Sequence, residues 1–352
     1  MDELKKPQLS IIIPTLNESD CLPGLLTDLQ NQKQVEFEII VGDGGSRDDT
    51  RAIVERAGGV VVESPRGRGF QMNRAAERAT GDYLLFVHAD SRIPDPGLLE
   101  KALVTLKTTI YQEGHERVAG HFRMQFIRSR NHHKIAYRYI EGKTGFNRPN
   151  TTSGDQGFLM TAGFFRQLGC FDTQLPFLED QTLAEKIRAT GKWITLPGCL
   201  STSARRFEAE GLHRRYILMS IIMGLYSTGV DEFFNRARQV YQTQDETGHL
   251  MLTPFFKIGW EMMRKDLGLW PSIVFWYRIG RYVRQNSWQM FYFFDILTHG
   301  DAVERYPFLR FHDRYFGPMT GFRICDALTA VASFIWFLLV LGPYFRIVES
   351  GK

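Results

Sequence analysis

The first ninety residues alternate between short apolar runs and amphipathic segments, and this alternation limits the possible folds more than any other feature. Four runs are short enough to be strands, at residues 9–13, 37–41, 60–63 and 83–87. Apolar runs of this length are typical of strands buried on both faces of a parallel sheet. The segments between them repeat apolar residues with a helical period, as residues 22–29 do. The sequence therefore predicts βαβ units in an α/β domain.

A polar stretch follows each predicted strand. The four stretches read PTLNE at 14–18, GDGGS at 42–46, SPRGRG at 64–69 and HADSR at 88–92. In open α/β sheets ligands bind beyond the carboxyl ends of the strands, so we expect these stretches to converge. The first turn lacks the GxGxxG pattern of dinucleotide-binding folds, and no P-loop sequence is present. The remaining expectation is a nucleotide held by several separate strand ends.

Composition sets further bounds. The chain has 352 residues, of which 43% are hydrophobic and 23% are charged, so a sizeable core is expected. Its net charge of +4 is too small to argue for a nucleic-acid partner. The four cysteines form no CxxC pair, which indicates free thiols in a reducing compartment. The apolar run at 9–13 is too short for a signal peptide, so we expect a cytoplasmic location.

The rest of the chain divides in two by composition. The middle has α+β character, with expected strands at 120–127 and 193–196 and expected helices at 179–189 and 212–229. Beyond residue 242 lie five of the six tryptophans, interleaved with lysine and arginine. We therefore expect one domain over residues 1–242 and a mainly helical region over residues 243–352.

The helical region suggests a membrane more than RNA. It lacks RNA-binding motifs and a strong basic excess, whereas tryptophan mixed with basic residues suits a membrane interface. Residues 327–345 carry no charge, close to the roughly 20 residues that span a bilayer. Two alternatives stay open: a membrane-embedded or monotopic helix, and a buried helix of a helical domain. The apolar helix at 216–230 favours membrane attachment, and a lipid or lipid-linked acceptor would then follow.

Five motifs in order carry a family resemblance: PTLNE, VGDGGSRDDT, GRGFQMN, LLFVHADS and FLEDQTLAEKIRATG. Over about residues 8–230 the chain resembles family 2 glycosyltransferases with the GT-A fold. It is most similar to a small bacterial subgroup with HAD-[ST], GDQG and SARR motifs, and about 110 C-terminal residues lie outside this resemblance. The resemblance implies a mixed, mostly parallel sheet flanked by helices. It also implies inverting transfer of a sugar from a nucleotide-sugar, expected to be a UDP-sugar, to an acceptor hydroxyl.

The resemblance assigns the first motifs to the donor. In the first turn the donor-binding residues are Pro14, Thr15, Asn17 and Glu18. Asp43 follows the second strand, where its carboxylate can accept the N3–H of uracil, and Arg68 takes the position that reaches the uracil or ribose. Within the same stretch we expect Ser46 to cap the next helix, with Asp49 at the helix start and Asp48 in solvent.

His88, Ala89 and Asp90 take the place of the D-x-D motif of the family. The resemblance implies that Asp90 coordinates Mg²⁺ or Mn²⁺ at the donor diphosphate, which suits a hard carboxylate. His88 replaces the first acid of the motif. It can still contact the ribose, or it can weaken or alter the selectivity for the cation.

The acidic pair Glu179 and Asp180 matches the catalytic base of the family. Inverting transfer needs one carboxylate to deprotonate the acceptor hydroxyl, and we assign this role to Asp180, with Glu179 as second candidate. On the acceptor and donor-sugar side the resemblance places Asp155, Gln156, Arg205 and Arg206. His213 is a further candidate metal ligand.

Simpler explanations and rival functions stay open at this point. Acidic residues also favour helix N-termini, and the SARR arginines can form ordinary salt bridges. A catalytically inactive nucleotide-sugar-binding or membrane scaffold protein is a rival function, with His88 as the one hint. A sugar nucleotidyltransferase is less favoured, since its first turn should be rich in glycine and carry arginine or lysine.

Overall fold

The computed structural model describes residues 6–174, 177–230, 233–234, 236–237, 240, 250–299 and 306–350. The chain forms two compact units. The first comprises Met1–Asn131 and Ile140–Ala204, and the second comprises His132–Tyr139 and Arg205–Lys352. The predicted boundary between residues 242 and 243 lies outside the described residues.

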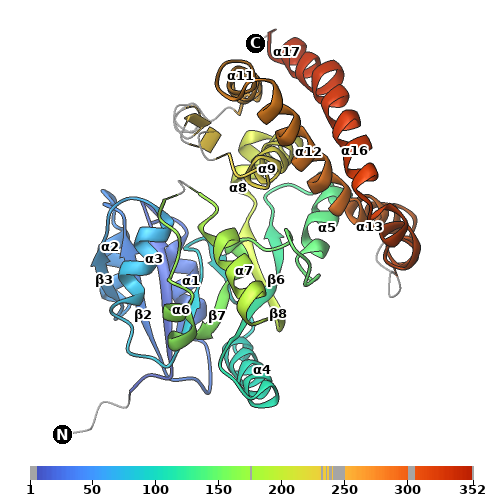
Figure 1. Ribbon diagram of the computed structural model, residues 1–352. Coiled ribbons are helices and arrows are strands. Elements are labelled where there is room, and N and C mark those ends of the chain that lie inside the picture. The colour runs from blue at the N-terminus through green and yellow to red at the C-terminus, as the bar shows by residue number, and fades with distance from the viewer. Residues whose placement is uncertain are drawn as a thin grey trace, which may run out of the picture. The chain divides into compact units, whose positions relative to one another are not determined.

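The first unit is built on an eight-stranded sheet with the order β3-β2-β1-β4-β7-β6-β8-β5 (Figure 1). The strands are β1 (Leu9–Thr15), β2 (Phe37–Asp43), β3 (Val60–Glu63), β4 (Tyr83–Phe86), β5 (Ser91–Arg92), β6 (Val118–Ile127), β7 (Phe158–Thr161) and β8 (Lys192–Ser203). The four N-terminal strands pair in parallel, as do β6 and β8. β7 runs antiparallel to β4 and β6, and β5 runs antiparallel to β8. The predicted α/β class with a mixed, mostly parallel sheet is confirmed.

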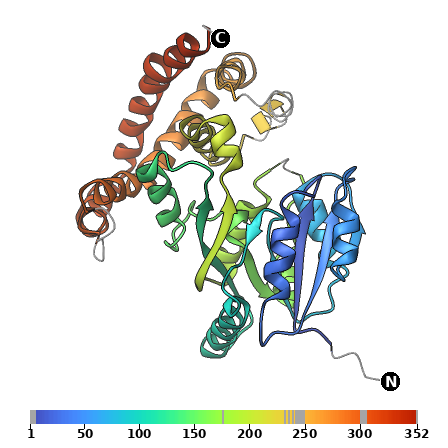
Figure 2. The same ribbon diagram turned by 180° about the vertical axis from the view of Figure 1, so that it is seen from behind.

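Helices cover both faces of this sheet, as Figures 1 and 2 show from opposite sides. The helical elements of the first unit are α1 (Leu22–Gln30), α2 (Thr50–Arg56), α3 (Arg68–Ala76), α4 (Leu98–Glu113), the 3₁₀ turn η1 (Gly154–Gln156), α6 (Ala162–Gln167) and α7 (Glu179–Thr190). α5 (Lys134–Lys143) is divided between the units, because its residues up to Tyr139 belong to the second. Alternate residues of β1 point to opposite faces. Ile11 packs in one core with residues of α1 and α4, whereas Ile12 packs in the other with residues of α3 and α7.

The parallel strands end in register. Thr15 at the end of β1 pairs with Asp43 at the end of β2, and Asp43 pairs with Glu63 at the end of β3. The polar stretches that follow these strands therefore begin at one level of the sheet. This register is what brings residues distant in sequence to one site.

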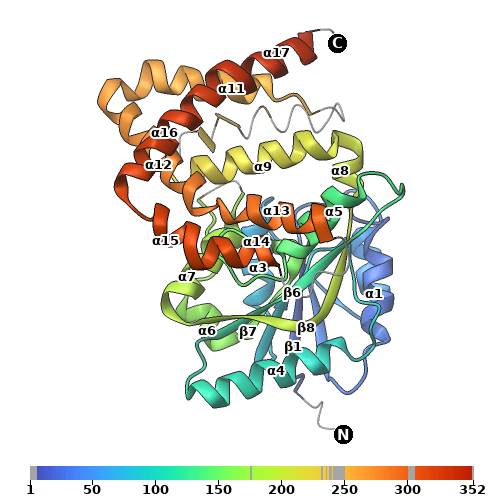
Figure 3. The same ribbon diagram turned by 90° about the vertical axis from the view of Figure 1, so that its right-hand side faces the viewer.

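The second unit is helical, as predicted. Its elements are α8 (Arg205–Glu210), α9 (Leu212–Tyr226), α11 (Thr253–Glu261), the π-turn η2 (Met262–Leu267), α12 (Leu269–Gln285), α13 (Trp288–His299), α14 (Pro307–Phe311), the π-turn η4 (His312–Phe316), α15 (Gly317–Thr320), α16 (Arg323–Trp336), the π-turn η5 (Phe337–Leu341) and α17 (Gly342–Ser350). The last three elements form one continuous rod, drawn in red in Figure 3.

This rod contains the uncharged segment singled out in the sequence. Arg323–Ser350 is 28 residues long and its most apolar 18-residue window has a mean hydropathy of 2.2, so it has the length and composition to cross a membrane. Only 17% of its most apolar window is buried. A helix buried in the core of a helical domain would be covered on most sides, whereas most of this window is exposed.

Candidate functional site

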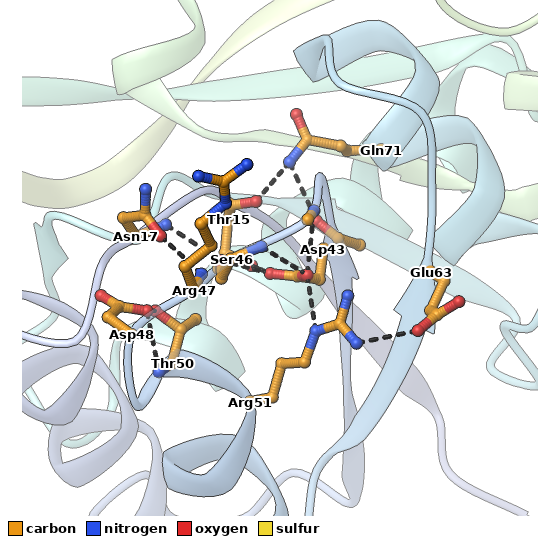
Figure 4. A network of polar contacts seen from close by, with 12 residues as sticks. Thr15, Asn17, Asp43, Ser46, Arg47, Asp48, Thr50, Arg51, Glu63 and Gln71 are labelled. Atoms are coloured by element: carbon orange, nitrogen blue, oxygen red, sulfur yellow. Dashed lines mark hydrogen bonds and ion pairs between the residues drawn. The ribbon is translucent and has the colours of Figure 1, made fainter.

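The carboxylate of Asp43 is the centre of a polar network beyond β1 and β2 (Figure 4). The side chain is 0% exposed. Oδ1 accepts hydrogen bonds from the hydroxyls of Ser46 at 2.5 Å and Thr15 at 3.2 Å. Oδ2 accepts from the backbone N–H groups of Gly45 and Ser46, each at 3.0 Å, and from Nε of Arg51 at 2.8 Å. Five donors therefore share the two oxygens.

This network holds Asp43 as an ion. Burial works against the charge, but the hydrogen bonds from Ser46 and Arg51 lower the pKa of the Asp43 carboxyl below its usual value. Arg51 also pairs with Glu63 of β3 at 2.8 Å, so it connects the ends of β2 and β3. The observed role of Asp43 is to fix the turn. Its contact with uracil stays a prediction, and that contact requires one of the present donors to give way.

The two aspartates that follow lie where the sequence analysis expected them, and Asp48 has an additional role. Asp48 Oδ1 accepts from both the N–H and the hydroxyl of Thr50, and Oδ2 accepts from the N–H of Ser19. Burial opposes the charge slightly, but these bonds lower the pKa of Asp48 to about 2. Asp49 precedes α2, where its side chain makes no capping hydrogen bond within the described part of the chain. Asp48 is exposed and Asp49 directly precedes α2, as expected, but Asp48 also holds the turn through hydrogen bonds that the sequence analysis did not predict.

The signal for this arrangement was present in the sequence. An aspartate two residues before a threonine is a common turn pattern, in which the side chain binds the following backbone N–H. The hydroxyl of Ser46, expected to cap α2, donates instead to Asp43 and accepts from the N–H of Asn17 at 2.9 Å.

The first turn is held by the same network. Asn17 has a left-handed backbone with φ of 55°, and its side-chain oxygen accepts the N–H of Arg47 at 2.8 Å. The N–H of Glu18 donates to the hydroxyl of Thr50 at 2.9 Å. Thr15 and Pro14 are buried in β1. Of the four predicted residues, Asn17 and Glu18 therefore lie in the turn itself, whereas Pro14 and Thr15 support it.

Gln71 is a residue of this site that sequence reasoning missed. From α3 its Nε2 donates to the carbonyl oxygens of Thr15 at 2.5 Å and Gly42 at 3.2 Å. A Cβ atom added to Gly42 would lie 2.2 Å from the Gln71 carbonyl oxygen, and one added to Gly44 would lie 2.9 Å from Nε2. The first two glycines of GDGGS thus permit the close packing of α3, and the only sequence signal was the place of Gln71 in GRGFQMN.

A second cluster gathers His88, Asp90 and Asp155. Nδ1 of His88 lies 2.8 Å from Oδ1 of Asp155, and one ligand atom from each of the three residues lies within 4.8 Å of the others. The His88 side chain is only 12% exposed. Its burial would lower the pKa of the imidazole, but the hydrogen bond to Asp155 outweighs it and raises the pKa above its usual value. Ala89, between the two ligands, is buried.

These three side chains fit a divalent cation. Two carboxylates suit Mg²⁺ and Mn²⁺ alike, whereas an imidazole ligand is better suited to transition metals than to Mg²⁺. The donor set therefore fits Mn²⁺ better than Mg²⁺. Asp155 was predicted on the sugar side, and no feature of GDQG in the sequence indicated that it would lie against His88.

Gly154 brings three motifs together. Its N–H donates to Oδ2 of Asp180 at 2.6 Å. A Cβ atom on Gly154 would lie 2.7 Å from Nε2 of His88 and 3.4 Å from Oδ2 of Asp180. The HAD, GDQG and Glu-Asp motifs, far apart in sequence, thus meet at one glycine.

The two members of the acidic pair lie in different environments. They begin α7 directly after Leu178, a non-glycine residue with φ of 76°. Glu179 is 5% exposed and its Oε1 lies 2.8 Å from Nε of Arg68, in a contact too bent for a hydrogen bond. Burial raises the pKa of Glu179, and the nearby Arg68 only partly offsets this. Asp180 is less buried and faces the Gly154 loop.

Gln156 faces the interior of the first unit and not a ligand. It is 0% exposed, and its Nε2 donates to Nδ1 of His121 at 2.8 Å and to the Thr144 carbonyl at 3.1 Å. Its Oε1 accepts the N–H of Ser153 at 2.8 Å. The structure thus makes Gln156 a support of the loop that carries Asp155, in place of the sugar contact expected from the sequence.

The remaining candidates lie in the second unit. Arg205 and Arg206 are exposed at the start of α8, and their contact with the sugar or diphosphate stays a prediction. His213 stacks on Phe345, with ring centroids 6.3 Å apart and planes at 17°.

Part of the chain is similar in sequence to known proteins. Residues 10–162 match the model of glycosyl transferase family 2. Over 105 residues the chain is 35% identical to a PGL/p-HBAD biosynthesis glycosyltransferase of Mycobacterium tuberculosis, a match that covers 27% of this chain and 40% of that protein. It is 30% identical over 122 residues to the GalNAc(5)-diNAcBac-PP-undecaprenol beta-1,3-glucosyltransferase of Campylobacter jejuni, covering 32% and 38% of the two chains. These matches span about two fifths of the relatives' length.

Among solved structures, S. aureus TarS 1–349 in complex with UDP-GlcNAc aligns with 94% of this chain and 81% of its own, at 17% identity and a TM-score of 0.45. The family match covers the stretches after β1, β2, β3 and β4 as well as the loop that carries Asp155. The similarity to glycosyl transferase family 2 is therefore a property of residues 10–162, which hold most of the candidate site.

Proposed function

We propose that this protein transfers a sugar from a nucleotide-sugar, with UDP as the nucleotide, to an acceptor hydroxyl with inversion at the anomeric carbon. The observation that carries the proposal is the meeting of His88, Asp155 and Asp180 around Gly154. His88 and Asp155 lie inside the segment that matches the family, whereas Asp180 lies beyond its end. A candidate cation site and a candidate base thereby lie within one small region.

In this mechanism Asp180 accepts the proton of the acceptor hydroxyl. The acceptor oxygen forms a bond to the anomeric carbon while the bond from that carbon to the diphosphate oxygen breaks, and the nucleoside diphosphate leaves. Asp180 suits this role better than Glu179. Glu179 is buried against Arg68, and its raised pKa means that its carboxylate is less readily ionised and so less available to accept a proton. Arg68 supplies positive charge near the leaving group.

His88, Asp90 and Asp155 would hold a divalent cation, Mn²⁺ in preference to Mg²⁺. When bound, that cation would neutralise charge on the diphosphate. Asp43 and the first turn would hold the nucleoside, with Asn17 and Glu18 nearest to solvent among the first-turn residues.

For the acceptor we propose a lipid-linked molecule at the cytoplasmic face of a membrane. The Campylobacter relative is named for an undecaprenol-linked substrate, and the rod Arg323–Ser350 exposes most of its apolar surface. Both observations favour an acceptor presented at a bilayer over one free in solution.

The test compares Asp180→Asn with the parent chain. Transfer is measured from a panel of radiolabelled UDP-, GDP- and dTDP-sugars to a bacterial membrane lipid extract with Mn²⁺, and UDP binding is measured by calorimetry. We expect transfer from a UDP-sugar, a loss of at least about 100-fold in Asp180→Asn, and unchanged UDP binding. Asp82→Asn is the control, because Asp82 is an exposed acid paired with Lys6 at 2.5 Å.

Two results would contradict the proposal. UDP binding without transfer by the parent chain in any extract would support the inactive binding protein. Transfer from GDP-sugars alone would contradict the choice of uridine.

A further inference from the structure

The end of the second unit exposes two apolar stripes in succession. The first stripe lies on Pro307–Thr320 and the residues after it, and consists of Phe308, Phe311, Tyr315, Met319 and Phe322, all exposed. They recur at intervals of three or four residues, so they share one side of the helical segment. Exposed aromatic residues in such a regular stripe mark an interaction surface.

The second stripe lies on the rod that follows. It consists of Ile324, Leu328, Val331, Ile335 and Leu339 before and within η5, and Ile347 beyond it, again all exposed. The opposite side of the rod is buried, at Asp326, Ala330, Leu341, Phe345 and Glu349. The rod therefore has, along its whole length, one face that packs against protein and one face that is exposed.

The π-turn keeps these two faces straight. Each residue of an α-helix is rotated by about 100° from the one before it. In an uninterrupted α-helix Ala330 and Leu341 would lie on the same side, but Glu349 would lie well away from that side. The wider turn at Phe337–Leu341 accommodates one extra residue and returns the later residues to register. Both the buried and the exposed face thus continue past η5.

Polar contacts fix the buried face at both ends. Oδ1 of Asp326 lies 2.5 Å from Nε of Arg284 in α12. The carboxylate of Glu349 accepts the N–H groups of Leu252 and Thr253, at 2.8 and 2.9 Å, and so caps the start of α11. Between these ends Gly280 of α12 packs directly on the backbone of Ala330. The rod lies along α12 and α11 as part of one helical layer (Figure 3).

This packing argues against a rod that crosses a bilayer. Trp276 of α12 contacts Phe337 in the middle of the rod, and exposed Arg278 lies half a turn further along α12. Phe256 of α11 also contacts Phe337, and its neighbour Lys257 is exposed. A spanning rod would carry these cations into hydrocarbon, where an unpaired charge is strongly disfavoured. A rod lying in the plane of the interface avoids this cost.

The charges beside the first stripe indicate the partner. Arg310, Arg314 and Arg323 are exposed along the same segment, and Arg314 lies over the ring of Tyr315 at 5.4 Å. Aromatic rings at headgroup depth with adjacent arginines suit a bilayer that contains anionic lipid. A second copy of the chain on this face would bring the same arginines together, which opposes a symmetric dimer.

We propose that the two stripes form a docking face for an anionic lipid bilayer, on which α14–α17 lie in the interface plane without crossing the membrane. The proposal concerns attachment and does not depend on sugar transfer. Among the alternatives that the sequence left open, it selects the monotopic helix over an embedded or a core helix, and it names the residues of the docking face.

The test is co-sedimentation of the full chain with phosphatidylcholine vesicles that contain or lack phosphatidylglycerol. We expect binding to the anionic vesicles that weakens with salt. Leu328→Asp with Val331→Asp should lower the affinity at least about tenfold, since each removes apolar area from the contact. The matched control is Val104→Asp with Tyr111→Asp on α4, because Val104 is 56% exposed and Val331 is 58% exposed. Circular dichroism checks that both variants remain folded.

The depth of insertion is measured by the quenching of tryptophan fluorescence with brominated lipids. The contribution of Trp336 is the difference in quenching between the parent chain and Trp336→Phe. Trp336 is exposed on the rod, so shallow bromines should quench it more than deep ones. No binding to anionic vesicles, equal losses in the stripe and control variants, or deep quenching would each overturn the proposal. A dimer in solution that the stripe variant abolishes would assign the face to a second copy instead.

Discussion

Arg68 at the start of α3 and Glu179 at the start of α7 form an ion pair, with Nε and Oε1 2.8 Å apart. The two residues belong to different motifs, one expected to bind the donor and the other to serve the reaction. The carboxylate is buried and the guanidinium is partly exposed. The pair therefore couples the predicted donor side of the site to the acidic pair.

This pair gives a prediction on stability. Arg68→Gln removes the charge that partly offsets the burial of Glu179, so we expect a loss of about 1 to 2 kcal/mol at neutral pH, limited by the exposure of Arg68. Because the folded-state pKa of Glu179 is raised, its contribution to stability is present at low pH and is lost as pH rises through that pKa. In Arg68→Gln this loss should be larger.

The measurement is urea unfolding of Arg68→Gln, Glu179→Gln and the double variant at two pH values. The double variant should recover most of the loss, because it leaves no buried charge. Lys101→Gln, which breaks the exposed pair with Asp95, should change stability by less than about 0.5 kcal/mol. A double variant as unstable as Arg68→Gln would show that the charge of Glu179 is not the cause.

Asp43 gives a prediction that separates a support role from a contact with the base. Asp43→Asn replaces an acceptor of five hydrogen bonds by a group that must also donate, so it should cost about 2 to 4 kcal/mol. The measurement is the free energy of unfolding together with UDP affinity. Asp49→Asn in the same stretch should leave both nearly unchanged. Normal stability with lost UDP binding would instead assign Asp43 to the base alone.

His88 gives a prediction on the cation. His88→Asp restores a carboxylate and removes the imidazole, so the preference for Mn²⁺ over Mg²⁺ should fall by about tenfold. The measurement is the metal dependence of UDP binding by calorimetry, with metal-free UDP binding as the internal control. An unchanged ratio of the two metals would mean that His88 does not reach the cation.

His121 gives a prediction on acid stability. Burial lowers the pKa of its imidazole from 6.5 to about 4, and Nδ1 accepts a hydrogen bond from Gln156, so protonation would set two N–H groups against each other. The unfolded chain binds this proton more tightly, so stability falls as pH drops from 6.5 towards 4. We expect on the order of 2 kcal/mol between about pH 7 and about pH 5.

The measurement is urea unfolding of the parent chain and His121→Asn at these two pH values. The variant should lose less stability on acidification, because it has no group to protonate at this position. Equal losses in both proteins would place the acid-sensitive group elsewhere.

The sequence by itself determined the class of the fold. The apolar runs at 9–13, 37–41, 60–63 and 83–87 became the parallel strands β1 to β4, since runs of this kind are typical of parallel sheets. The expected burial on both faces is wrong for β3, which lies at the edge of the sheet and is partly exposed. It also determined that the polar stretches follow the strand ends, and parallel pairing then brought Asp43 and Thr15 into hydrogen-bond contact.

Only the tertiary structure decided the partners of the side chains. Nothing local to GDQG indicates that Asp155 turns to His88 while its neighbour Gln156 turns to His121, because both orientations depend on strands and loops far away in sequence. In the same way an uncharged run at 327–345 is compatible with a core helix, a spanning helix or an interfacial one. Periodicity marks an apolar side chain, but only packing decides whether protein covers it, and on this rod α11 and α12 cover one face alone.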